Sequence, residues 1–178
     1  MTRWSRLVGV AALLAALAPV PAAATTIVPV TTEELTQRSD EVIVATVRAS
    51  SSRWERGLIV TDHELVVDAS IRGRALVHAT VFVRTPGGVV GRIAQAVPDA
   101  PTLEVGRTYV FFLSGGVGPV RFLAHLTAAV VPVETSAQGG LVAQPPTALL
   151  VDRSHATAAA PPPMPLPAML DRVRSVPR

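Results

Sequence analysis

The densest cluster of titratable side chains in the sequence is Asp62-His63-Glu64. A metal centre or an acid–base site needs such groups to converge on one pocket. Successive side chains of an extended strand point to opposite faces, so His63 points away from both acids unless a bulge intervenes. We therefore expect the two acids in solvent and His63 hydrogen-bonded near the edge of the core. A metal-dependent or acid–base hydrolase that uses His63 with Asp62 or Glu64 is kept as the alternative.

Other chemistry has little support in the sequence. His78, His125 and His155 are far apart, and none has the spacing at which zinc ligands usually begin. The Gly87–Gly91 run lacks the Gly-Lys-Ser/Thr ending of a phosphate-binding loop, and the chain has no cysteine for thiol catalysis. We predict no catalytic residue, no metal ligand and no cofactor.

Trp54 is the best candidate for a binding residue. It lies between Arg53 and Arg56 in a segment that leads to a turn. An exposed tryptophan beside arginines could stack on a sugar ring or a base, and it could equally cover one end of a β-barrel. We predict that Trp54, Arg53 and Arg56 bind a ligand.

Most of the chain reads as strands. The segments 41–48, 58–70, 76–84 and 120–126 are rich in β-branched and apolar residues, as are 128–134 and 141–143. In the second segment the odd positions, mostly apolar, share the expected core face with His63 as its polar exception. In the third segment we expect the odd positions Val77, Ala79, Val81 and Val83 in the core. The run 107–113 is apolar on both faces and is expected to be the most buried strand. Turns are predicted at 85–88, 97–101, 104–106 and 114–118, with extended structure resuming at 89–93.

Two short helices are expected at the ends of the folded part. A threonine at the start of 31–38 could cap the first turn, where Glu33 and Glu34 also favour the helix dipole. Near the C-terminus, Leu166, Met169, Leu170 and Val173 have helical spacing, so this helix either docks on the β domain or frays. Short strands with glycine turns indicate a mainly β fold, an OB-like partly open antiparallel barrel first and a two-sheet sandwich second.

The first 24 residues have the layout of a secretory signal peptide. Arg3 and Arg6 precede an apolar run of 14 residues, 7–20, and Ala22-Ala23-Ala24 follows as a cleavage site. We expect signal peptide 1–24, a β domain at 25–154, an Ala/Pro-rich linker at 155–165 and the helix at 166–178. The protein is expected to be exported, to the periplasm or beyond, with no membrane span after cleavage.

The charge balance disfavours nucleic acid as a partner. The chain has 16 Lys+Arg and 13 Asp+Glu, and removing Arg3 and Arg6 leaves 14 basic residues and a net charge of +1. Binding to nucleic acid usually needs a clustered basic face. We expect another exported protein or a cell-envelope polymer as the partner, and the sequence leaves the oligomeric state open.

Several short motifs together resemble those of a known class of proteins. They are Ser39-Asp40 before Val42–Ala45, Arg53-Trp54, Ile59–Thr61, Val66-Val67 with Ile71–Gly73, Val81–Gly88, and Val105-Gly106 before Tyr109–Leu113. This pattern, over about 39–133, resembles exported, uncharacterised bacterial proteins with an OB-like β domain. The class typically has Gly-Glu where this chain has Gly106-Arg107.

The resemblance implies a fold and no catalytic residues. Some members of the class accompany secreted metalloproteases, which implies a protease-associated accessory or inhibitor domain as a further alternative. The main expectation from the sequence is an exported, non-catalytic β-barrel module that binds a protein or a cell-envelope polymer.

Overall fold

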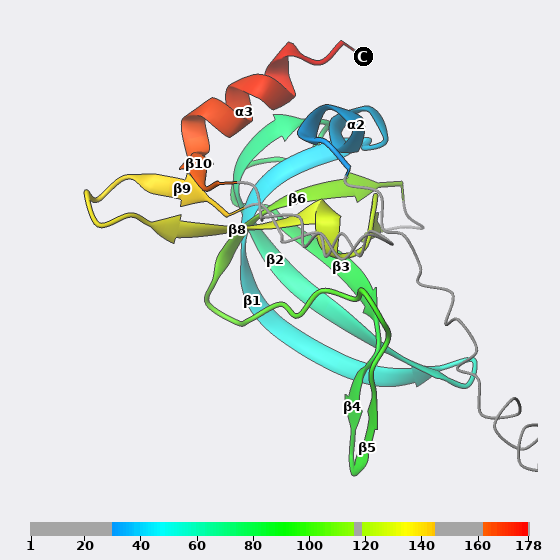
Figure 1. Cartoon of the computed structure of the whole chain (residues 1–178). Helices are drawn as coiled ribbons and strands as arrows, with labels where there is room; N and C mark the ends of the chain where they lie inside the picture. The colour runs from blue at the N-terminus through cyan, green and yellow to red at the C-terminus, as the bar shows by residue number, and fades with distance from the viewer. Residues whose placement is uncertain (1–29, 116–118, 145–161, 178) are drawn as a thin grey trace, which may run out of the picture.

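The computed structural model describes residues 30–115, 119–144 and 162–177, and the chain is mainly β, as predicted (Figure 1). The expected signal peptide lies outside the described residues, as do 116–118 of the expected hairpin and 155–161 of the expected linker. The elements are α2 (Thr32–Gln37), β1 (Glu41–Glu55), β2 (Leu58–Arg72), β3 (Thr80–Pro86), β4 (Gly88–Val90), β5 (Ile93–Gln95), β6 (Thr108–Ser114), β7 (Val120–Leu123), η1 (Thr127–Ala129), β8 (Val130–Thr135), β9 (Leu141–Ala143), β10 (Met164–Pro165) and α3 (Leu166–Ser175).

Five strands pair in an order that returns to the first strand. β1 pairs with β2 and β2 with β3, both antiparallel, and β3 pairs with β7 in parallel. β7 pairs with β6, and β6 pairs back with β1. The sheet extends from β6 through β8 and β9 to β10, while β4 and β5 form a separate hairpin. Each of the five strands therefore has a neighbour on both sides for part of its length.

The β1–β2 hairpin is longer than expected. We predicted that β1 ends near Arg48, but it continues through the three serines 50–52 to Glu55. The register shifts between Val47 and Ala49, so Arg48 is an extra residue and the faces of β1 exchange at that point. Beyond this bulge, Ser50 and Ser52 share a face with the residues opposite them on β2.

Two apolar clusters lie on the two faces of the sheet, and β6 contributes to both. Tyr109, Phe111 and Leu113 point into one, while Val110 and Phe112 point into the other. The expectation of a strand buried on both faces is confirmed. The first cluster consists of Ile43, Ala45, Val47, Leu65, Val67, Val81, Val83, Leu103, Tyr109, Phe111, Leu113 and Val130.

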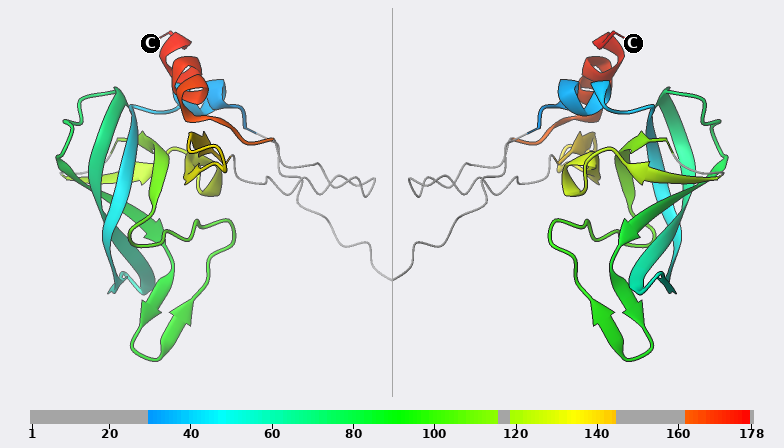
Figure 2. Two further views of the ribbon diagram at one scale, coloured as in Figure 1. Left: turned by 90° about the vertical axis from the view of Figure 1, so that its left-hand side faces the viewer. Right: turned by 90° about the vertical axis from the view of Figure 1, so that its right-hand side faces the viewer.

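Helices α2 and α3 cover the second cluster. They contact each other, and Figure 2 shows them at one end of the sheet, with the β4–β5 hairpin at the other. Thr31 caps α2 in a capping box with Glu34, as the sequence suggested. The C-terminal helix is docked: Leu166, Met169 and Val173 are buried, and Arg72 donates a hydrogen bond to the Val176 carbonyl.

Several predicted boundaries were wrong. The third strand begins at Thr80 and not at Leu76, because residues 73–79 form a loop in which His78 has φ +66°. Val77 is consequently 49% exposed, and Ala79 is only half-buried. β3 continues to Pro86, inside the predicted turn.

Three further segments also differ from expectation. Residues 88–95 form a hairpin with its turn at 91–92 and not one extended run. The predicted strand 120–126 ends at Leu123, and the 3₁₀ turn η1 occupies the start of the segment predicted as 128–134. The end of the expected linker, Met164–Pro165, pairs with β9 as β10.

Candidate functional site

The Asp62-His63-Glu64 cluster does not converge. The His63 side chain is buried, at 4% exposure, on the face that lines the first apolar cluster. Asp62 and Glu64 lie on the opposite face, where Asp62 binds Arg84 and Glu64 lies 3.3 Å from Arg48. Among the residues that the structure describes, no group of three or more His, Asp or Glu side chains could hold a metal ion.

His63 instead links three strands. Its Nδ1 lies 2.8 Å from Oγ of Ser50 on β1, and its Nε2 lies 2.9 Å from Oγ1 of Thr85 on β3. Burial holds the pKa of His63 below its ordinary value near 6.5, and the nearby charge of Asp62 opposes this shift. A neutral imidazole matches this arrangement, because it has one donor and one acceptor for its two hydroxyl neighbours. The group therefore acts as an internal polar link.

Arg53, a predicted binding residue, belongs to an alternating set of four charges on the outer face. Arg84 donates to both carboxylate oxygens of Asp62, at 2.6 and 3.1 Å, and its Nη1 lies 3.0 Å from Glu55. Nη2 of Arg53 lies 2.8 Å from Glu55 and 3.2 Å from Asp62. We call Arg53, Glu55, Asp62 and Arg84 the charge quartet. The hydrogen bonds from Arg84 hold the pKa of Asp62 below 3.8.

Trp54 and Arg56 lie at the end of the β1–β2 hairpin. Glu55 pairs with Leu58, so the turn consists of Arg56 and Gly57, both with positive φ (+50° and +83°). This two-residue turn suits the twist of the strands. Trp54, which pairs with Ile59, is 49% exposed, and Leu58 is 58% exposed. Arg56 is exposed and has no ion-pair partner within the described residues.

The β4–β5 hairpin is held against this end of β1 and β2 by specific hydrogen bonds. The Gly87 amide donates to the Ile59 carbonyl at 2.8 Å, and the Thr61 hydroxyl donates to the Gly87 carbonyl at 2.7 Å. The Ile59 amide donates to Oε1 of Gln95 at 2.8 Å. Gly88, at φ +132°, passes so close to the hydroxyls of Ser52 and Thr61 that a Cβ would collide with both. The two hairpins are therefore joined as one unit.

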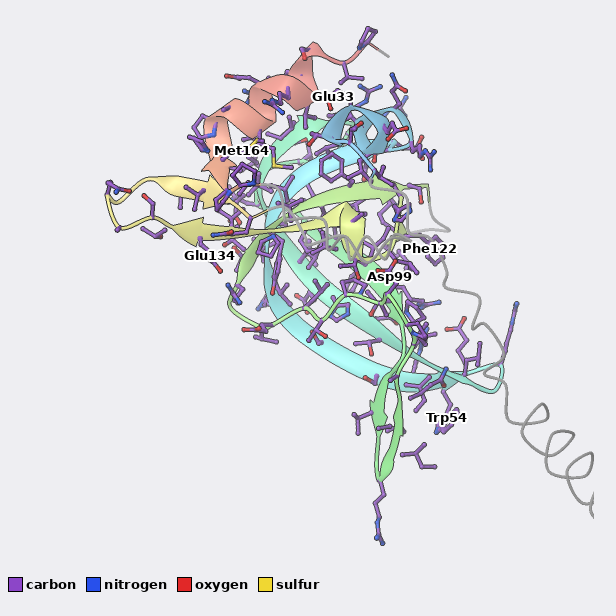
Figure 3. All side chains as sticks on the ribbon, in the orientation of Figure 1. Glu33, Trp54, Asp99, Phe122, Glu134 and Met164 are labelled. Atoms are coloured by element: carbon purple, nitrogen blue, oxygen red, sulfur yellow. The ribbon has the colours of Figure 1, made fainter. Side chains whose placement is uncertain are left out.

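The β4–β5 hairpin carries its own exposed apolar side chains. Val89 is 61% exposed and Ile93 is 54% exposed, on either side of a turn that contains Arg92. Figure 3 shows Trp54 at this end of the molecule, next to the hairpin, and β4 contacts both β1 and β2. We call Trp54, Arg56, Leu58, Val89, Arg92 and Ile93 the hairpin-end surface.

Sequence reasoning identified only part of this surface. It singled out Trp54 and Arg56. It missed Val89, Arg92 and Ile93 because the segment 85–93 was read as a turn followed by one strand, and it took Leu58 only as the first residue of the strand 58–70. The signal was present in Val89-Val90-Gly91-Arg92-Ile93, where glycine and arginine interrupt two short apolar runs. Of the three predicted binding residues, Arg53 is the one that forms ion pairs with two acids, Glu55 and Asp62.

Comparison with known proteins assigns neither a family nor a function to the chain. The chain matches no protein-family model, and no curated protein matches it. No helix within the described part of the chain is long and apolar enough to cross a membrane. The function must therefore be argued from the hairpin-end surface itself.

Proposed function

We propose that this chain is an exported, non-catalytic β-barrel module of OB-like topology that binds a protein or a cell-envelope polymer through its hairpin-end surface. The observation that carries the proposal is the exposure of Trp54. Half of this large aromatic side chain faces solvent at the end of the β1–β2 hairpin, and Leu58, Val89 and Ile93, at the ends of the same two hairpins, are each more than half exposed. Exposed aromatic and aliphatic side chains gathered at one end of a molecule support an interaction site there.

The pairing order supports the barrel part of the proposal. The order β1-β2-β3-β7-β6, with β6 paired again to β1, is a five-stranded ring, and its β3–β7 pair is parallel. A small closed or partly open barrel of five strands is the OB architecture, whose loops commonly bind polymers. A two-sheet sandwich would not require the closing β6–β1 pair.

Export rests on the sequence pattern of the first 24 residues. The two arginines, the apolar run and the Ala22–Ala24 site together support secretion to the periplasm or beyond. The resemblance over 39–133 supports the same compartment. It is also the sole support for a protease-associated accessory or inhibitor role, so that role remains the weaker alternative.

The hydrolase alternative has less support from geometry. It needs His63 and an acid in one pocket, whereas the carboxylates of Asp62 and Glu64 lie on the face opposite His63 and are held by arginines. The described residues favour the binding module for this reason.

The test is affinity capture from an exported protein and polymer fraction, with the full chain as bait. Trp54→Ala should abolish capture of a bound component while the melting temperature stays within about 2 °C, because the side chain is half-exposed. The matched control is Leu76→Ala, which removes an exposed side chain from the loop between β2 and β3. Equal capture by both variants and the unchanged chain would overturn the proposal.

A further inference from the structure

We infer that two copies of this chain associate through β1, whose edges pair antiparallel about a two-fold axis at Ser52. This contact goes beyond the proposed function, because it uses the backbone of one strand and not the side chains of the hairpin-end surface. β1 pairs with β6 as far as Thr46 and with β2 as far as Glu55 (Figure 1). Within the described residues, the stretch 49–55 thus has β2 as its one neighbouring strand, and we call it the open edge of β1.

The hairpin turn decides which backbone groups of β1 face away from β2. Glu55 and Leu58 flank a two-residue turn, and the pair that flanks such a turn is hydrogen-bonded. Hydrogen-bonded and non-hydrogen-bonded pairs alternate along an antiparallel ladder, so the Trp54–Ile59 pair is of the second kind. Ile59 confirms this, because its amide and carbonyl both bond to the segment 87–95 on the other side of β2.

The same alternation makes Ser50, Ser52 and Trp54 the residues whose N–H and C=O groups point away from β2. No hydrogen bond from the described part of the chain reaches these groups. The serine hydroxyls are engaged elsewhere, since Oγ of Ser50 lies 2.8 Å from Nδ1 of His63 and Oγ of Ser52 lies 2.8 Å from Oγ1 of Thr61. An extended polypeptide offers donors and acceptors at the matching spacing, so the open edge fits another strand.

The length of the open edge fits a second copy of the same strand. At one end it is bounded by Val47, whose amide and carbonyl bond to the segment 106–107. At the other end it is bounded by the turn 56–57. Ser52 is the middle residue of 49–55, so a two-fold axis at Ser52 lays the whole open edge of one copy along that of the other.

This register satisfies the outward backbone groups and is sterically self-complementary. Each outward residue lies opposite an outward residue of the second copy, and each such pair is joined by two hydrogen bonds. The larger side chains of one half of the open edge lie opposite the small ones of the other half, and within 49–55 no two like charges are opposite. The pairs across the axis are Ser50 with Trp54, Ser51 with Arg53, and Ala49 with Glu55, with Ser52 opposite itself.

Analytical ultracentrifugation of the full chain tests this contact. We expect the unchanged chain to dimerise as its concentration rises, and Ser52→Pro to weaken the dimer by about tenfold or more. Proline removes an outward N–H at the axis and places its ring where the second strand would pack, yet it breaks no backbone bond to β2. Ser52→Ala is the matched control, because it loses the same hydroxyl but keeps the N–H, and it should dimerise like the unchanged chain.

A thiol crosslink locates the contact. The chain has no cysteine, so Ser51→Cys introduces a single thiol. Ser51 is exposed, and in the proposed register its two copies are diagonal neighbours about 7–8 Å apart. A bismaleimide that spans about 8 Å should therefore join two Ser51→Cys chains into a covalent dimer. Ser175→Cys, at an exposed serine of α3, should stay monomeric under the same conditions.

Three results would overturn the inference: an unchanged chain that sediments as a monomer up to about 100 µM, a dimer that Ser52→Pro leaves intact, or a dimer that Ser51→Cys does not crosslink. Circular dichroism verifies that Ser52→Pro is folded, and Ser50→Pro, which also removes an outward N–H, replaces it if it is not. None of these results bears on the proposed function, since Trp54→Ala alters capture through a side chain and keeps the backbone of β1.

Discussion

Nε2 of His63 lies 2.9 Å from Oγ1 of Thr85, and this buried contact joins β2 to β3 within the inner face of the sheet. Leu65 and Val67 lie on one side of it, and Thr61, with the attached β4–β5 hairpin, lies on the other. The polar link therefore lies between the first apolar cluster and the part of β2 that holds the β4–β5 hairpin.

Stability should depend on pH through His63. Burial keeps the pKa of the folded imidazole below 6.5, so the unfolded chain binds more protons as the pH falls below that value. The free energy of unfolding should decrease as the pH falls through about 6.5 and level off below the folded-state pKa. Urea denaturation at several pH values measures this. His63→Gln should flatten that part of the profile, while His78→Gln, at an exposed position, should not; equal profiles for all three proteins would contradict the assignment.

Arg84→Met should destabilise the fold by about 1–2 kcal/mol, because it leaves Asp62 and Glu55 close together with Arg53 as their remaining cation. In the unchanged chain, the lowered pKa of Asp62 contributes stability that is present above pH 3.8 and is lost as the pH falls through the folded-state pKa. In the variant, the pKa of Asp62 should rise toward 3.8, so this pH-dependent contribution to the free energy of unfolding should become smaller. Chemical denaturation and an NMR titration of the Asp62 carboxyl check the two effects.

Arg48→Met serves as the comparison for that variant. It removes an arginine whose side chain is 67% exposed and whose pair with Glu64 is long. Its effect should stay within about 0.5 kcal/mol. If both variants lost the same free energy of unfolding, the charge quartet would stabilise the fold no more than the exposed Arg48–Glu64 pair does.

Gly88→Ala should loosen the β4–β5 hairpin. The new methyl group would meet the hydroxyls of Ser52 and Thr61, and the backbone has φ +132°, so a cost of about 2–3 kcal/mol is expected. Gly57→Ala isolates the backbone part, since Gly57 also has positive φ but open space around it, and should cost about 1 kcal/mol. Hydrogen exchange at the Gly87 amide measures the loosening, and unchanged protection in Gly88→Ala would refute it.

Met169→Ala should cost about 2–5 kcal/mol, because Met169 is 2% exposed between α3 and the sheet. The neighbouring exposed position provides the reference: Arg172→Ala should change stability by less than about 0.5 kcal/mol. Thermal unfolding measures both. If Met169→Ala matched Arg172→Ala, the C-terminal helix would contribute little to the fold.

Several features of the fold could be predicted from the sequence because they depend on near neighbours. Alternation placed His63 on the inner face and Asp62 and Glu64 on the outer one, which the structure confirms. The uninterrupted apolar run of β6 predicted burial on both faces, and the threonine before two glutamates marked the start of α2. The predicted end of β1 was wrong because three serines were read as a break, whereas long-range pairing with β2 keeps them extended.

The candidate site divides in the same way. Trp54 and Arg56 could be found in the sequence because an aromatic residue between arginines, next to a glycine turn, is a local pattern. Their association with Val89, Arg92 and Ile93 could not, because it depends on contacts such as that between the Ile59 amide and Gln95, which are 36 positions apart. The ion pairs of Arg53 could not be predicted either, because they form in a cluster with a residue of β3. Arg84 of β3 binds Asp62 and Glu55, the same two acids that pair with Arg53.

The sequence by itself thus determined the faces of the strands, the helix start and the chemistry of one hairpin end, since these follow from side-chain periodicity and local backbone preference. The tertiary structure alone decided that the base of the β4–β5 hairpin lies against β2, and which arginines of the described residues pair with acids. The physical reason is that hydrogen bonds and ion pairs between distant segments form only when a particular strand register brings the partners within about 3 Å.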